Sequence, residues 1–116
     1  PGHVDFTVEV ERCLRVLDGA VLVISALSGV EAQSEAVFAQ ARRFQVPTII
    51  FVNQCDREGA SFLAAMAEIE RRLDVRAVAV QYPLGEGRDF EGLVDLIEAR
   101  AYRFPGGELS AEAIPA

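Results

Sequence analysis

Two short apolar runs constrain the fold of this chain more than any other feature. Residues 20–26 and 48–52 are almost continuously apolar rather than alternating, which favours parallel strands that are covered on both faces. Between them, apolar side chains recur at helical spacing from about Ala32 to Phe44. A strand, a helix and a second strand in this order predict part of an α/β sheet.

Helices are also predicted before and after these two strands. Residues 6–17 carry an apolar stripe at helical spacing, and Asp5 can cap that helix. A third helix is expected after Ser61. Its apolar face consists of Phe62, Met66, Ile69 and Leu73. The predicted fold class is therefore α/β, a partial doubly wound parallel sheet with helices on both faces.

The sequence pattern changes after Leu73. Residues 75–82 predict a strand, and residues 83–89 predict a loop rich in turn-forming residues. Residues 90–104 fit either a helical stripe or strands, and periodicity alone leaves both open. Residues 85–87, Gly-Glu-Gly, are not expected to form a phosphate loop, because they include an acid and no Gly-Lys-Ser/Thr follows.

The charge balance and the cysteines exclude several classes of function. The chain has 18 acidic and 11 basic residues and a net charge of −7. Broad nucleic-acid contact by this segment is not expected, because it would need clustered Lys and Arg. The longest apolar run is far too short to span a bilayer. Cys13 and Cys55 lack metal-ligand spacing and are expected to be reduced, packed thiols of a cytoplasmic protein.

An Asn-x-x-Asp pattern directly after the second apolar run is the strongest candidate binding site. The carboxylate of Asp56 could accept hydrogen bonds from the N1–H and the exocyclic amine of guanine, a pairing that adenine does not offer. Such a charge-assisted bond is worth roughly 1.5–3 kcal/mol. Asn53 would act partly on the base and partly by bracing neighbouring loops. The alternative is that Asn53 and Asp56 are simply turn formers ahead of Gly59.

The first residues of the chain, Pro1-Gly2-His3, provide a second candidate. His3 is the only histidine, and it is either a surface bystander or a group that positions water beside a γ-phosphate. The backbone N–H of Gly2 could approach a phosphate, because no side chain stands in the way. A Pro-Gly-His segment followed about fifty residues later by Asn-x-x-Asp is typical of a GTPase.

Residues 1–6, Pro-Gly-His-Val-Asp-Phe, are highly specific to translational GTPases. Together with residues 29–35 and 81–84, they closely resemble the GTPase domain of bacterial elongation factor G and of elongation factor G-like proteins. The resemblance implies a P-loop GTPase-like sheet. It implies that His3 is the catalytic histidine that orients water, that Gly2 senses the γ-phosphate, and that Asn53 and Asp56 hold guanine.

The same resemblance implies a division of the chain and one departure from the family. Residues 1–74 would be the central part of the GTPase domain, and residues 75–116 the start of an insert that is mainly β. Gln54 replaces the lysine that is usual in the family, so the charge at that position is lost. The insert is associated in the family with the ribosomal stalk protein.

The resemblance further implies a parent protein that hydrolyses GTP on the ribosome during translocation and uses GTP or GDP with Mg²⁺. We expect this segment alone to be inactive and to bind no nucleotide, because it contains neither a phosphate loop nor switch I. Its unpaired sheet edges are expected to favour self-association. The alternatives are a ribosome-protection or other paralogous factor, a non-enzymatic module that docks on the ribosome or stalk, and an α/β domain without a nucleotide site.

Overall fold

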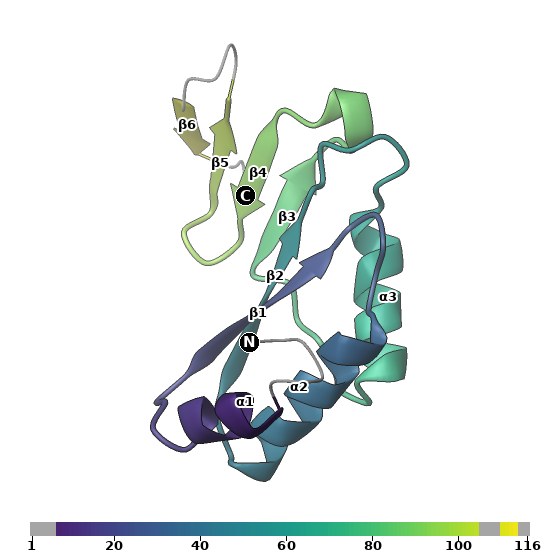
Figure 1. Ribbon diagram of the computed structural model, residues 1–116. Coiled ribbons are helices and arrows are strands. Elements are labelled where there is room, and N and C mark those ends of the chain that lie inside the picture. The colour runs from purple at the N-terminus through teal and green to yellow at the C-terminus, as the bar shows by residue number, and fades with distance from the viewer. Residues whose placement is uncertain (1–6, 105–109, 114–116) are drawn as a thin grey trace.

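The computed structural model describes residues 7–104 and 110–113. These residues form three α-helices, a short 3₁₀ helix and six strands arranged in two sheets (Figure 1). The elements in chain order are α1 (Thr7–Leu14), β1 (Ala20–Ser25), α2 (Ala32–Arg43), β2 (Thr48–Asn53), α3 (Phe62–Arg72), β3 (Gln81–Leu84), η2 (Gly87–Asp89), β4 (Gly92–Asp95), β5 (Arg100–Arg103) and β6 (Ser110–Ala113).

The first sheet is a parallel pair, which confirms the predicted α/β class. Strands β1 and β2 pair in register from Ala20 opposite Thr48 to Ser25 opposite Asn53, and α2 connects them. A parallel pair needs such a crossover, because a tight turn can join only antiparallel strands. The carboxyl ends of both strands therefore lie at one edge of the sheet.

Local signals in the sequence set the ends of the helices. α3 begins at its predicted cap, where the Ser61 hydroxyl accepts a hydrogen bond from the backbone N–H of Ala64 at 3.1 Å. Both α2 and α3 are followed closely by a residue in the left-handed conformation, Gln45 with φ of 57° and Asp74 with φ of 54°. That conformation commonly ends a helix, because it turns the chain back over the last carbonyl groups.

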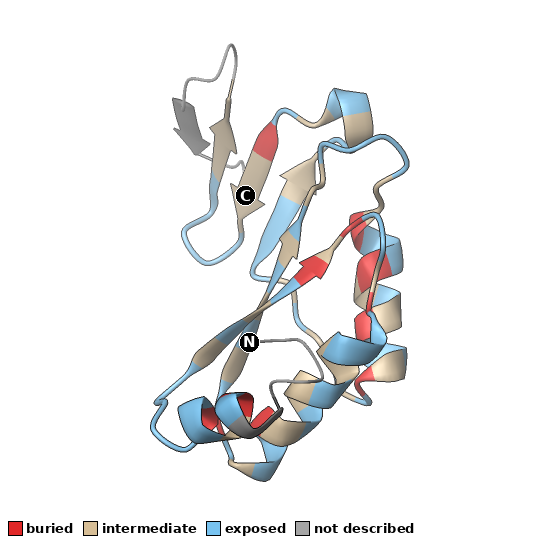
Figure 2. Ribbon diagram, viewed as in Figure 1, coloured by how far each residue is buried: buried red, intermediate tan, exposed pale blue. Residues whose placement is uncertain are grey.

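The hydrophobic core lies between one face of the parallel pair and the helices (Figure 2). Ile24 of β1 and Val30 are each 1% exposed, and Ile69 of α3 is 2% exposed. Ile50 and Val52 of β2 pack against these buried residues. A second cluster joins α1 to α2 and to the start of β1. It consists of Val10, Leu14, Ala41 and Val46, with Ala20, Val37 and Phe44 packed against it.

In the part of the chain that the structure describes, the opposite face of the parallel pair is exposed, although the continuous apolar runs favoured strands that are covered on both faces. Val21 and Val23 of β1 are 64% and 57% exposed, and Ile49 and Phe51 of β2 are 69% and 54% exposed. Right-handed crossovers keep successive helices on one face while the strand order advances in one direction. Helices change face only where that order reverses, and the two described parallel strands contain no reversal.

The second sheet is antiparallel, with the order β3-β4-β5-β6. Residues 90–104 therefore form strands rather than a helix, as the family resemblance implied. The strand predicted for residues 75–82 is wrong in its bounds, because β3 begins only at Gln81 and continues through Leu84. Val75 and Ala77 pack against the core beside α3 instead. The alternating burial of residues 75–78 therefore reflects packing against the core, and none of the described strands pairs with them.

Within the described residues, no helix is both long and apolar enough to cross a membrane. Cys13 and Cys55 are free, as predicted. Cys13 is exposed, however, so the expectation that both thiols are packed is wrong for it; only Cys55 is half-buried.

Candidate functional site

The candidate site lies where the carboxyl ends of β1 and β2 meet. Ser25 and Asn53 are the last paired residues of the two strands. Ligands of open α/β sheets bind at such edges, outside the carboxyl ends of the strands. Gln54 and Asp56 follow β2 directly, so the structure brings three of the predicted site residues into one turn. Asn53 and Asp56 are exposed, and Gln54 is half-buried.

Backbone hydrogen bonds fasten this turn to the loop that follows β1. The N–H of Ala26 donates to the carbonyl of Asn53 at 2.8 Å, and the N–H of Ser61 donates to the carbonyl of Ala26 at 3.0 Å. Gln54 has φ of 65°, in the left-handed region, and its carbonyl accepts the N–H of Arg57 at 3.1 Å. The turn that carries Asp56 is therefore closed on itself and attached at both ends.

The side chain of Gln54 contacts β1. The hydroxyl of Ser25 donates to Oε1 of Gln54 at 2.8 Å. Sequence reasoning did not single out Ser25. The signal was present, because Ser25 is the one polar residue within the apolar run 20–26 and stands at its carboxyl end.

The loop between β3 and β4 packs against the same turn from the other side. The N–H of Gly87 donates to the carbonyl of Cys55 at 2.9 Å, and the carboxylate of Glu86 accepts the N–H of Phe62 at the start of α3. Gly85 allows this path, because it has φ of 77° and a Cβ there would lie 2.1 Å from the carbonyl oxygen of Asp89. Glu86, the acid that argued against a phosphate loop at residues 85–87, therefore stabilises the amino end of α3.

The Cys55 thiol lies inside this turn and stays protonated at neutral pH. Burial raises the pKa of the Cys55 thiol, and the nearby carboxylates of Glu86 and Asp56 raise it further. The thiol contacts the carbonyl oxygen of Val52 at 3.8 Å. Cys55 therefore has a packing role here and is not a reactive thiolate.

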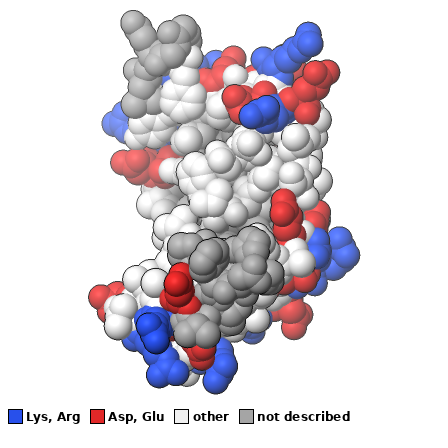
Figure 3. All heavy atoms as spheres, in the orientation of Figure 1, with Lys and Arg blue, Asp and Glu red and all other residues white. Residues whose placement is uncertain are grey.

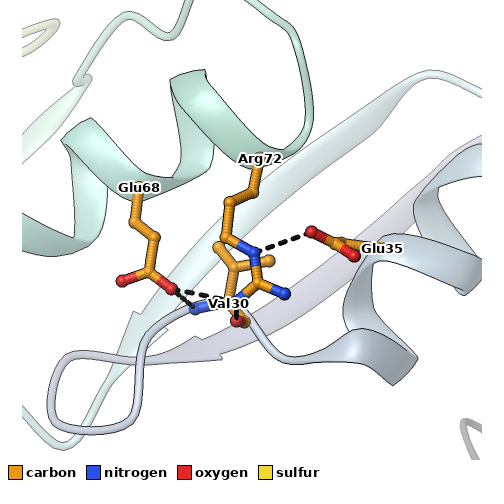
Figure 4. Close-up of polar contacts among 4 residues, drawn as sticks. All are labelled: Val30, Glu35, Glu68 and Arg72. Atoms are coloured by element: carbon orange, nitrogen blue, oxygen red, sulfur yellow. Dashed lines mark hydrogen bonds and ion pairs between the residues drawn. The ribbon is translucent and has the colours of Figure 1, made fainter.

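An ion-pair network fixes the path of the chain between β1 and α2 (Figure 4). Nε of Arg72 lies 2.7 Å from Oε1 of Glu35, and its Nη1 lies 3.3 Å from Oε1 of Glu68. Nη1 also donates to the carbonyl of Val30, whose N–H donates to Glu68 at 2.9 Å. The hydrogen bond with Glu35, followed by that with Glu68, raises the pKa of Arg72. The guanidinium thus joins α2, α3 and the loop after β1.

The structure does not bear on the other predicted residues of the site. Gly2 and His3 lie outside the described residues, so their roles stay predictions. Among the residues that are described, no group of three or more His, Cys, Asp or Glu side chains is placed to hold a metal ion.

Comparison with known proteins identifies the class of this chain. The model of the elongation factor Tu GTP-binding domain matches residues 1–111. The chain therefore belongs to the family of elongation factor Tu GTP-binding domains. Within that family it corresponds in sequence to a section of elongation factor G, a translational GTPase.

The elongation factors G of three bacteria show this correspondence. The protein of Mycoplasma pneumoniae is 56% identical over 116 residues, which are 99% of this chain and 17% of that protein. Those of Mycoplasma genitalium and Ureaplasma parvum are 54% and 52% identical, over 93% and 100% of this chain and 16% and 17% of their own lengths. The chain thus spans about a sixth of these relatives.

A solved structure shows the same fold. A crystal structure of a protein from Thermus thermophilus superimposes with a TM-score of 0.84 over 99% of this chain and 17% of the other. The sequence identity is 30%.

Proposed function

We propose that this segment supplies the guanine-recognition loop of a protein that hydrolyses GTP on the ribosome during translation elongation. One observation carries the proposal. Asn53 and Asp56 are both exposed in a closed turn at the carboxyl edge of a parallel pair. The carboxylate of Asp56 accepts hydrogen bonds from the guanine N1–H and amine, and Asn53 contacts the base and braces the neighbouring loops. The elongation factors G that the chain resembles support this assignment.

The remaining parts of the proposed reaction rest on the sequence resemblance alone. His3 orients the attacking water, and Gly2 senses the γ-phosphate. Other segments of the protein hold the phosphates and Mg²⁺, so residues 1–116 alone bind guanine nucleotide weakly. Residues 1–74 belong to the central GTPase fold, and residues 75–116 begin an insert that contacts the ribosomal stalk protein. The parent protein acts in the cytoplasm.

Exposed apolar residues in the segments next to strands β3 and β4 support the stalk contact. Val78 and Ile97 are 80% and 77% exposed, and Val80 and Leu96 are 46% and 53% exposed. The N–H of Leu96 donates to the carbonyl of Val80 at 2.9 Å, which brings the turn after β4 beside the segment before β3. Apolar side chains gathered on a surface in this way commonly mark a protein contact.

A graft tests the proposed function. Residues 1–116 replace the corresponding section of the Mycoplasma pneumoniae elongation factor G, and calorimetry measures the affinity for GDP. We expect the graft to bind GDP within an order of magnitude of the host protein, and the isolated chain to show no micromolar binding. A folded graft that does not bind GDP would contradict the proposal. If that graft still binds the stalk protein, the docking-module alternative is correct instead.

Self-association of the isolated chain is a second expected property. In the part of the chain that the structure describes, β1 and β2 pair only with each other, so each has an open edge that can accept another strand. Figure 3 shows an uncharged surface across the middle of the molecule, where Figure 1 places these strands. We expect oligomers by sedimentation velocity and a monomer for Phe51→Lys. Leu63→Lys is the control, because Leu63 is 60% exposed on α3. If the unsubstituted chain is monomeric at high concentration, this expectation is wrong.

A further inference from the structure

The hydroxyl of Ser25 uses its full hydrogen-bonding capacity at the candidate site. It accepts the N–H groups of Leu27 and Ser28, each at 3.1 Å, and it lies 2.8 Å from Oε1 of Gln54. A serine hydroxyl has one donor and two acceptor lone pairs. Because the two N–H groups occupy both lone pairs, the hydroxyl must donate to Gln54. This requirement fixes the Gln54 amide with its oxygen toward Ser25.

Gln54 holds an unfavourable backbone conformation that needs support. Its φ of 65° is left-handed, a conformation that a residue with a Cβ keeps only where the surroundings impose it. The sheet ladder reaches as far as Asn53, which pairs with Ser25 and accepts the N–H of Ala26. The hydrogen bond from the Ser25 hydroxyl to the Gln54 side chain attaches one further residue to β1, at the point where the chain turns toward Asp56.

We infer that Ser25 is a positioning residue for guanine discrimination, which acts through Gln54 on the turn that carries Asp56. The inference rests on the proposed function. It also gives a reason for glutamine at a position where lysine is usual in the family. An amide oxygen can accept a hydrogen bond from the Ser25 hydroxyl, whereas the ammonium group of a lysine has no acceptor atom. Ser25 and Gln54 therefore form a matched pair that supports the loop without a charge.

Hydrogen exchange on the chain itself tests the contact. The reporter is the amide of Arg57, which donates to the Gln54 carbonyl. Ser25→Ala should speed its exchange by about tenfold, the effect of one lost hydrogen bond, and Ser25→Thr should restore it. In a Gln54→Ala background, Ser25→Ala should have no further effect. Thr48→Val is the control, because the Thr48 hydroxyl bonds the Val46 carbonyl at the far end of β2.

Two results of the exchange experiment would overturn the inference. One is unchanged exchange at Arg57 in Ser25→Ala. The other is full additivity of the Ser25 and Gln54 substitutions, because independent residues would not act through each other.

Nucleotide discrimination in the graft gives a readout that a purely structural role would not change. Inosine diphosphate lacks the exocyclic amine that Asp56 is proposed to recognise. Ser25→Ala should therefore reduce the preference for GDP over inosine diphosphate severalfold, and Ser25→Thr should restore it. Equal weakening of both nucleotides would overturn the inference. If the unsubstituted graft binds no GDP, the proposed function fails, and the exchange experiment still decides whether Ser25 supports the turn.

Discussion

Replacing Asp56 with asparagine in the graft should exchange guanine for xanthine as the preferred base. A carboxylate can accept two hydrogen bonds from guanine, whereas an asparagine amide presents a donor there and suits the carbonyl that xanthine has in place of the amine. Loss of one charge-assisted bond corresponds to an affinity for GDP that is lower by about 10- to 150-fold. Calorimetric titration with GDP and with xanthosine diphosphate measures both affinities.

The matched control is Asp18→Asn, which makes the same change of charge at an exposed position before β1. It should leave both affinities unchanged. If Asp56→Asn loses affinity for GDP without gaining any for xanthosine diphosphate, Asp56 does not read the base. Asn53 and Asp56 would then be only turn formers.

Replacing Ile24 with alanine should destabilise the chain by about 2–5 kcal/mol, the usual cost of emptying a well-packed site. Ile24 is 1% exposed and packs with Val30, Ile69 and Leu73. Ile24→Val, which removes less volume, should cost only about 0.5–1.5 kcal/mol. Urea unfolding followed by circular dichroism, at concentrations below those that promote oligomers, gives the free energy of unfolding.

The adjacent residue provides the control for this prediction. Val23 lies on the same strand but faces the opposite side of the sheet, where it is 57% exposed. Val23→Ala should therefore cost no more than about 1 kcal/mol, the range of strand propensity. A cost similar to that of Ile24→Ala would mean that both faces are packed, against the one-sided core described above.

The sequence predicted most of the first sheet, because its signals are local. The apolar runs fall on β1 and β2, and the helical stripe from Ala32 falls on α2. The burial of the strands was not predictable in the same way. A continuous apolar run shows that both faces favour contact, but it does not show which segments cover them. Val23 and Phe51 are as apolar as Ile24 and remain exposed in the described chain.

The candidate site was predictable only in part, for a related reason. Asn53, Gln54 and Asp56 are close in sequence, so the motif itself placed them together. Ser25 contacts Gln54 from 29 residues earlier in the chain, and Glu86 contacts Phe62, at the start of α3, from 24 residues later. Contacts over such distances depend on the parallel pairing and on the packing of the second sheet. The apolar runs predicted a parallel pair but not its register, and no pattern in the sequence predicted how the second sheet packs.

Because one face of the β1–β2 pair is exposed, the free energy of unfolding of this segment depends on the concentration of any chain that covers that face, including further copies of this chain. Any polypeptide that covers Val21, Val23, Ile49 and Phe51 only in the folded state shifts the folding equilibrium by mass action. At about a hundredfold excess of such a partner over its dissociation constant, the gain is about 2.7 kcal/mol. The melting temperature of the chain should therefore be quoted with its concentration. Its folding and its assembly are two parts of one linked equilibrium.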